Sequence, residues 1–229
     1  MSRAFAVFKL TKLISANPDC VGSVVDGLNA AARNSASVVR SLLSPTLDGS
    51  INSGNLVWHL QFPDRTAFRA WEKDPDSGMR AAALLADKAL VSQVESIAYQ
   101  GGRAGRKRAL DKGVYRMLWI NVNRAADEAA IAQFEAETFE MGLYISGIAN
   151  WQISRVDEAS GTRSWTHVWE QEYENLDGLM KSYMMHPHHW GWVNRWYDPE
   201  CVEHMIDNYV CHAFCDFTGG AIINPSDQS

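Results

Sequence analysis

The side chains best suited to chemistry gather in one short segment of the second half of the chain. Residues 182–197 read SYMMHPHHWGWVNRWY, which combines three histidines and two tyrosines with several tryptophans. Neutral imidazole can accept or donate a proton near neutral pH, and a phenol can orient a carbonyl group or carry a proton. Taken alone, this composition indicates a cavity with polar groups.

Helical spacing separates the histidines of this segment. If a helix begins at the proline, where first-turn amides have no intrahelical partner, His189, Val193 and Trp196 lie on one face. The side chain of His189 is therefore expected on the apolar face of this helix. His186 and His188 also fit the solvated start of a helix, and the tryptophans of the segment also fit ordinary core packing.

A second candidate group lies on a strand-like segment, Trp165-Thr166-His167-Val168-Trp169-Glu170. Strand alternation places Trp165, His167 and Trp169 on one face. A histidine between two tryptophans predicts an aromatic pocket with one proton-transfer group. The same pattern also fits a core histidine whose hydrogen bonds are satisfied.

The elements that must position these residues occur twice in the same order. In the first half the apolar patterns indicate strands at 4–10, 37–43, 55–62 and 91–99, and helices at 20–32 and 64–88. In the second half they indicate strands at 114–122, 144–156, 165–173 and 203–214, and helices at 125–141 and 176–196. Each half therefore reads β-α-β-β-α-β, the ferredoxin-like order, and the fold class is α+β.

This repeat divides the chain into four parts. We expect a first ferredoxin-like repeat at 1–101, a basic glycine-containing linker at 102–112, a second repeat with the site at 113–217, and a C-terminal tail at 218–229. Two helices cannot cover both faces of a four-stranded sheet, so each sheet needs an apolar partner. We expect the sheet of each repeat to be the apolar partner of the other, so that the two repeats form one fused α/β barrel.

Composition narrows the class of protein. The chain has 229 residues, 46% hydrophobic and 21% charged, which is ordinary for a globular protein. A net charge of −6 argues against nucleic acid as a partner. The basic residues of the linker, Arg103, Arg106, Lys107 and Arg108, leave a linker or an anion site open. No apolar run is long enough for a membrane span and the N-terminus is unlike a signal peptide, so we expect a cytoplasmic protein.

The cysteines do not predict a metal site. Cys211 and Cys215 fall in an expected strand, where residues four apart lie about 13 Å from each other. That separation is too large for two ligands of one ion, so buried thiols are the better interpretation.

Several of these residues resemble a known family. Tyr183-x-x-His186-Pro187-x-His189-x-x-x-Val193 is similar to the Y-x-x-H-P-x-H-x-x-V signature of the stress-responsive dimeric α/β-barrel (Dabb) proteins. Residues 145–148 resemble the I-P-G-I turn of that family, with serine in place of proline. Residues 166–170 resemble a strand of its polyketide cyclases, of the olivetolic acid cyclase type.

The resemblance implies roles for individual residues. It implies that His167, Tyr183 and His189 are catalytic. Around them we expect a substrate pocket lined by Trp58, Trp165, Trp169, His186 and Trp196. The first repeat departs from the pattern, with Leu56 where His167 would be and Trp71 where Tyr183 would be. We therefore expect a degenerate scaffold there and one site per chain.

The resulting hypothesis is a cofactor-independent lyase or isomerase acting on an aromatic or polyketide-like small molecule. His189 would be the general base, oriented by Tyr183, and His167 would assist as an acid or oxyanion partner. No nucleotide-binding glycine pattern or pyridoxal signature calls for an organic cofactor, and we expect no metal. Two alternatives stay open: a non-catalytic small-molecule-binding stress protein, and a haem- or metal-dependent oxygenase. Dimerisation also stays open, since the family usually builds its barrel from two chains.

Overall fold

The protein divides into two compact units. The computed structural model describes residues 7–123 and 125–223. The first unit comprises the chain up to Gly101 together with Val156–Ser164, and the second comprises Gly102–Arg155 with the chain from Trp165 onward. Each unit is an antiparallel five-stranded sheet with helices, so the expected pair of ferredoxin-like α+β repeats is confirmed.

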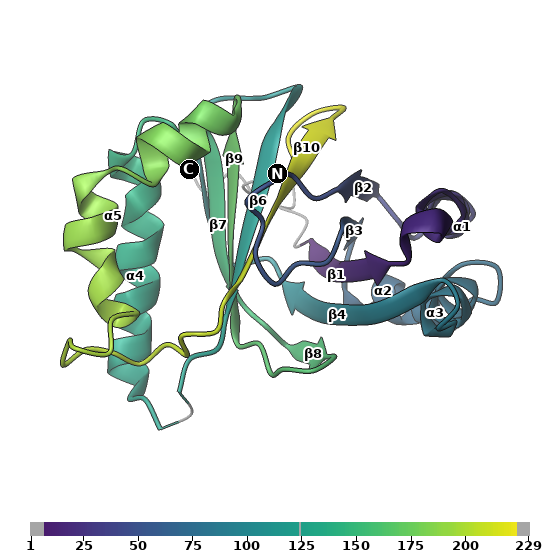
Figure 1. The fold of residues 1–229 in the computed structure, drawn as a ribbon, viewed down its shortest axis with the longest axis horizontal. Coiled ribbons are helices and arrows are strands. Elements are labelled where there is room, and N and C mark those ends of the chain that lie inside the picture. Colours follow the sequence, from purple (N-terminus) through teal and green to yellow (C-terminus); the bar gives the residue numbers. More distant parts are fainter. Residues whose placement is uncertain (1–6, 124, 224–229) are drawn as a thin grey trace, which may run out of the picture. The chain divides into compact units, whose positions relative to one another are not determined.

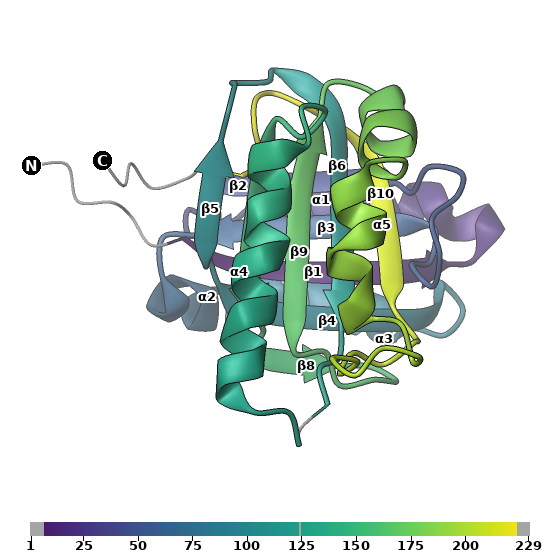
Figure 2. The same cartoon turned by 90° about the vertical axis from the view of Figure 1, so that its left-hand side faces the viewer.

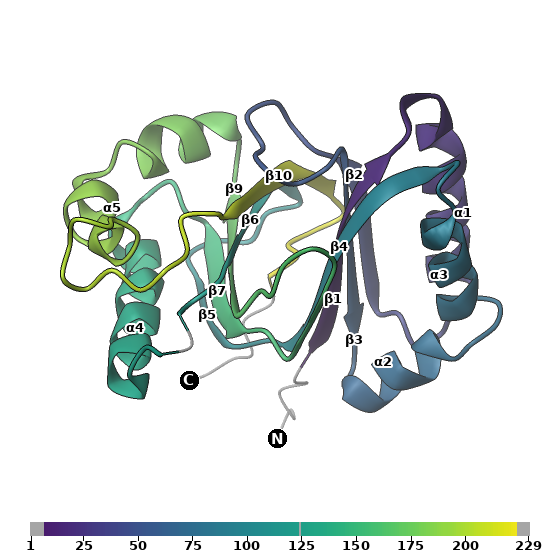
Figure 3. The ribbon, with the colours of Figure 1, turned by 60° about the horizontal axis from the view of Figure 1, so that its bottom comes forward.

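The first unit has the strand order β2-β3-β1-β4-β8. Its strands are β1 (Phe8–Ala16), β2 (Arg40–Pro45), β3 (Leu56–Phe62), β4 (Val91–Gln100) and β8 (Glu158–Ser160). Its helices are η1 (Pro18–Cys20), α1 (Val21–Arg33), α2 (Arg65–Glu72) and α3 (Gly78–Ala86). Figure 3 shows α1, α2 and α3 on one face of this sheet, where they cover the core of the unit.

Two predictions for the first unit need correction. The helical stretch expected at 64–88 is two helices, since Pro75 disfavours helical backbone in the residue before it. The first strand, expected at 4–10, runs instead over Phe8–Ala16, because buried apolar residues continue through Leu13 and Ile14; residues 1–6 lie outside the described chain.

Strand β8 is an element that the sequence did not predict. It follows β7 in the second repeat but pairs antiparallel with β4 of the first unit, with Ser96 opposite Ser160 and Ala98 opposite Glu158. A short segment of the second repeat therefore completes the edge of the first sheet.

The second unit has the strand order β10-β6-β9-β7-β5. Its strands are β5 (Arg103–Arg106), β6 (Lys112–Ile120), β7 (Asn150–Arg155), β9 (His167–Tyr173) and β10 (Cys211–Thr218). Its helices are α4 (Glu128–Tyr144), the π-helix η2 (Gly178–Tyr183), α5 (Pro187–Gly191) and the 3-10 helix η3 (Val193–Trp196). Figures 1 and 2 show α4 and α5 over one face of this sheet.

The boundaries in the second unit also differ from those expected. Helix α4 begins after the N-cap Asp127, whose side chain accepts a hydrogen bond from the amide of Ala129, and continues to Tyr144, so β7 starts later than predicted. The helix expected at 176–196 is three short helical pieces. The closing strand begins at Cys211 rather than at residue 203. The residues between Pro199 and this strand form an irregular loop.

The segments expected as linker and tail both take part in the second sheet. Residues 103–106 of the basic segment form β5, which pairs with β7. Within the tail, Ile222 and Ile223 are buried, and their amides donate to the buried carboxylate of Glu172. Cys211 and Cys215 are buried residues of β10. None of the helices in residues 7–123 and 125–223 has the length and apolar character needed to cross a membrane.

The indole of Trp151 ties α4 and β5 to the second sheet. It packs on two glycines: a Cβ on Gly142 of α4 would lie 2.1 Å from the ring, and one on Gly105 of β5 would lie 2.2 Å from it. Phe139 adds a tilted ring contact at 5.6 Å between centroids. Glycine is therefore required at both positions by close approach.

We predict that Gly142→Ala destabilises the protein although it lies inside a helix. Alanine favours a helix over glycine by about 1 kcal/mol, but overpacking a buried ring costs about 1–3 kcal/mol. The matched control is Gly22→Ala in α1, where an added Cβ meets nothing within 4 Å. Urea unfolding should show a lower midpoint for Gly142→Ala and an unchanged or higher midpoint for Gly22→Ala. An equal increase of the urea midpoint in both variants would contradict the packing argument.

Candidate functional site

The second unit contains a cavity of about 420 Å³ between its sheet and its helices. The cavity is lined from the sheet by β6 and β10 and from the other side by α4, η2, α5 and η3. Its lining residues are Arg116, Leu118, Met141, Tyr183, Met184, His189, Val193, Asn194, Tyr197, Asn208, Val210 and His212.

Among the residues that the structure describes, Arg116 is the only charged side chain that lines this cavity, and it is 1% exposed. It lies in β6 opposite Gln171 of β9, and its Nη1 donates to the Gln171 side-chain oxygen. Nη1 also lies 3.4 Å from the Tyr183 hydroxyl, and the guanidinium stacks 4.9 Å from the centre of that ring. On the other side, Nε donates to His212 Nε2 at 3.1 Å.

All the hydrogen-bond partners of this guanidinium are neutral. Among the described residues, no aspartate or glutamate lies within ion-pair distance of Arg116. A buried charge is normally paired, because an unpaired one loses its hydration without compensation. The cavity therefore offers an anionic ligand group a fixed cation with a planar set of donors.

The arginine determines the protonation of His212. A guanidinium has donors only, so His212 Nε2 must be the unprotonated, accepting nitrogen. Burial, then the charge of Arg116 and the neighbouring His189, lower the pKa of His212 to about 2. His212 is thus a neutral acceptor at physiological pH.

Tyr183 and His189 line the same cavity side by side. Tyr183 ends the π-helix η2, a geometry frequent at functional sites, and its ring lies 4.7 Å from that of His189 between centroids. Burial, then Arg116 and His186, lower the pKa of His189 to about 4. Nδ1 of His189 is buried and has no hydrogen-bond partner among the described residues. It is therefore a neutral nitrogen that is free to accept a proton.

His167 does not join this group. It begins β9, four residues from Gln171, which corresponds to about 13 Å along a strand. Its Nε2 lies 3.1 Å from Glu135 of α4 and its Nδ1 lies 2.9 Å from the hydroxyl of Thr166. Burial lowers its pKa, and Glu135 partly offsets this effect. His167 lies on the same face of β9 as Trp169 and Gln171, but the length of the strand separates it from Tyr183 and His189.

The other expected pocket residues also lie outside the cavity lining. Trp58 belongs to the core of the first unit, where its ring contacts Trp71 at 5.9 Å. Trp165 precedes β9 and contacts Trp119, which lies on the opposite face of β6 from Arg116.

The remaining candidates have structural contacts near the cavity. Trp169 is a buried residue of β9 opposite Leu118, and Trp196 donates from its indole to Glu137 at 2.7 Å. His186 caps α5 by accepting the amide of His188 at its Nδ1. Of the residues predicted from the sequence, the structure thus brings Tyr183 and His189 together at the cavity.

The cavity residues that sequence reasoning missed include Arg116, Tyr197 and His212. A signal existed for Arg116, since it is the charged residue of the otherwise apolar and aromatic run Val114–Ile120, on the same face as Leu118. His212 carried no such signal, because its role depends on the pairing of β10 with β6. Burial raises the pKa of Tyr197 strongly, so this phenol stays protonated. Within the described chain, no group of three His, Cys, Asp or Glu side chains is placed to hold a metal ion.

Comparison with known proteins identifies the family of the second repeat and the fold of the chain. Residues 114–211 match the family described as the stress responsive A/B barrel domain. An anthrone oxidase-like protein has a similar structure, with a TM-score of 0.66 at 8% identity over 95% of this chain and 93% of its own. No curated protein matches the sequence.

Two further solved structures share the fold. A putative monooxygenase from Lactobacillus acidophilus NCFM has a TM-score of 0.58 at 10% identity, over 96% of this chain and 100% of its own. Chlorite dismutase from Candidatus Nitrospira defluvii has a TM-score of 0.54 at 9% identity, over 92% of this chain and 91% of its own. At these identities the likeness is one of fold.

We predict that the charge of Arg116 causes part of the lowering of the His189 pKa. In Arg116→Gln the repulsive charge is gone, so the His189 pKa should rise above about 4 and stay below the ordinary 6.5, because burial, the larger cause, remains. NMR titration of the histidine side chains measures this, with Arg108→Gln, an exposed arginine paired with Glu174, as the control. Since the folded pKa lies below the unfolded one, the histidine also makes unfolding easier as pH falls from 6.5 towards 4. An unchanged His189 titration in Arg116→Gln would refute the coupling.

Proposed function

We propose that the second repeat, whose residues 114–211 are a stress responsive A/B barrel domain, is a small-molecule enzyme that performs acid–base chemistry on an anionic or enolisable aromatic compound. The observation that carries this proposal is the buried guanidinium of Arg116, which faces a cavity with only neutral partners beside two proton-transfer groups. The reaction class is that of a lyase or isomerase without an organic cofactor.

Arg116 and Tyr183 would bind the oxygen of the substrate on which charge develops. The guanidinium keeps its charge at any physiological pH, so it can hold a carboxylate, phenolate or enolate oxygen. Its Nη1 donates to the Tyr183 oxygen, which leaves the phenolic proton free to point at the substrate. Fixed donors in a site that excludes water stabilise an oxyanion without reorganisation during the reaction.

His189 would take the proton from the carbon next to that carbonyl group. Its low pKa keeps the imidazole neutral, and Nδ1 has no partner within the described part of the chain, which suits a base. A bound anion offsets the field of Arg116, so binding should raise the His189 pKa towards the range in which a base is most effective. The proton returned to another atom then completes either an isomerisation, a ring closure or a carbon–carbon cleavage.

Two other functions are outcomes of the same experiments. A non-catalytic binding protein would retain the preference for anions without turning any ligand over. An oxygenase would consume oxygen during turnover, and a haem- or metal-dependent one would show a Soret band or stoichiometric metal after purification. Cyclisation, isomerisation and cleavage differ in product mass or isotope exchange, so mass spectrometry separates them.

We predict that the cavity prefers anions because of Arg116. Aromatic carboxylates should bind about 10–100-fold more tightly than the matched neutral amides, the range expected for a charge-assisted hydrogen bond. Arg116→Met should abolish this ratio, while Arg108→Gln should keep it. Isothermal titration with benzoate and salicylate against benzamide and salicylamide measures it. Equal binding of acid and amide by the unmodified protein would overturn the anion site.

We also predict that turnover depends on the two proton-transfer groups. When aromatic hydroxy and keto acids are screened for a change in mass, any activity found should fall at least about 100-fold in His189→Gln and Tyr183→Phe, in keeping with positioned proton transfer. His204→Gln, at an exposed histidine, is the control.

A third variant, His167→Gln, separates the two assignments of the site. If this variant loses as much turnover as His189→Gln while its ligand affinity is unchanged, the resemblance-based role of His167 holds. The cavity around Arg116 would then be only part of the site.

A further inference from the structure

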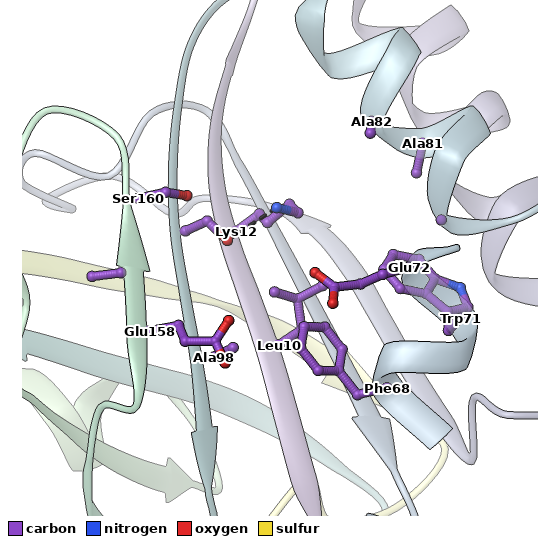
Figure 4. Close-up of a pocket in the computed structure, with 13 residues that line it drawn as sticks. Leu10, Lys12, Phe68, Trp71, Glu72, Ala81, Ala82, Ala98, Glu158 and Ser160 are labelled. Atoms are coloured by element: carbon purple, nitrogen blue, oxygen red, sulfur yellow. Dashed lines mark hydrogen bonds between the residues drawn. The ribbon is translucent and has the colours of Figure 1, made fainter. Parts of the chain in front are cut away.

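The first unit, expected to be a scaffold, has a cavity of its own. It encloses about 250 Å³ between the sheet and helices α2 and α3 (Figure 4). Its apolar walls come from Leu10, Phe68, Trp71, Ala81, Ala82, Ala98 and Ala159, and its polar groups are Lys12, Glu72, Ser96, Glu158 and Ser160.

Lys12 is placed on the face of β1 that normally carries core residues. Leu10 and Ile14, two residues before and after it, belong to the hydrophobic core under the helices. Strand alternation therefore directs the lysine side chain toward the same side, and it lines the cavity. Figure 4 shows Lys12 and Glu72 pointing toward the same space.

The amine of Lys12 is held by a neutral partner. Nζ donates to the hydroxyl of Ser96, opposite it on β4, at 3.0 Å. Among the described residues, no carboxylate lies within ion-pair distance of Nζ. The two acids of the cavity, Glu72 from α2 and Glu158 from β8, are both bonded to Arg69 instead.

Burial affects the charge state of this amine. It lowers the pKa of Lys12 to about 8, and the attraction of Glu72 offsets only part of that effect. The side of the cavity formed by α3 supplies Gly78, Ala81 and Ala82, which carry no charge. About a quarter of the amine is therefore uncharged at pH 7.5 and carries a free lone pair.

We propose that the first repeat holds a second site, in which the Lys12 amine forms an imine with a small aldehyde or ketone bound in this cavity. The site is independent of the function proposed for the second repeat. The apolar walls would hold the hydrocarbon part of the ligand, and the limited volume restricts it to a compact molecule. Lysines made nucleophilic by an apolar pocket are the usual starting point for imine chemistry.

The reaction balances without a further reagent. The nitrogen lone pair attacks the carbonyl carbon, a C–N bond forms, and the C=O π electrons move to oxygen, which takes up a proton. The resulting carbinolamine loses its hydroxyl group as water while nitrogen gives up its proton, and the C=N bond remains. The hydroxyl of Ser96, 3.0 Å from Nζ, can accept the proton from nitrogen and pass its own to the departing oxygen.

Reductive trapping tests this proposal on the full chain. The protein is incubated with benzaldehyde and cyanoborohydride, and the modified lysines are identified by peptide mass mapping. At pH 7.5 a lysine with a pKa near 8 has about 200-fold more free amine than one at 10.5, so Lys12 should be labelled at least about tenfold faster than the exposed Lys73 and Lys88. The rate should saturate with benzaldehyde concentration, and its pH dependence should have a midpoint near 8.

Two variants keep the result interpretable. Lys12→Arg retains the charge and should remove the fast labelling, while Ala82→Phe keeps the amine but occupies the cavity and should slow labelling of Lys12 alone. Circular dichroism and urea unfolding verify that both variants are folded. Labelling of Lys12 at the rate of Lys73 and Lys88, or a rate that rises linearly with benzaldehyde, overturns the proposal. These outcomes do not bear on Arg116 and His189, whose tests use different ligands.

Discussion

The second unit is organised around a guanidinium that is buried without a counter-charge. Removing a cation from water is costly unless donors are matched to acceptors, and Arg116 meets that demand with Gln171, Tyr183 and His212. Because these partners are neutral, the charge still acts on its surroundings. It keeps His212 in its accepting tautomer and helps to keep His189 uncharged.

This arrangement requires the acids of the second unit to be engaged elsewhere. Glu170 and Glu172 alternate with Gln171 on β9 and therefore face the other side of the sheet, where Glu170 accepts from Tyr115 and Glu172 accepts from backbone amides of the tail. On the helix side, Glu137 is bonded to Arg195 and Trp196. A single shift of register in β9 would bring two carboxylates beside Arg116 and remove its capacity to bind an anionic ligand.

Sequence patterns predicted the features of this structure that depend on residues close together in the chain. The order of the elements and the two repeats follow from periodicity, and the family resemblance implied that Tyr183 and His189 belong to one site. The pairing of β8 with β4, and the meeting of Arg116 with His212, join segments about 60 and about 100 residues apart, and no local pattern contains the register that sets them side by side. Alternation places His167 and Gln171 on one face of β9, but sharing a face does not mean sharing a cavity, and the catalytic role of His167 stays a prediction.

The two repeats place a cation on the same kind of surface but with different chemical consequences. Lys12 lies on β1 and Arg116 on β6, each on the helix face of the first strand of its repeat. A guanidinium cannot lose its proton in a protein, so burial leaves it as a binding group for negative charge. An ammonium can lose its proton, so burial converts it into a nucleophile. The first repeat lacks the histidine motif, but it still has a cavity with a buried cation. In each repeat, the identity of that one cation decides which chemistry the cavity can support.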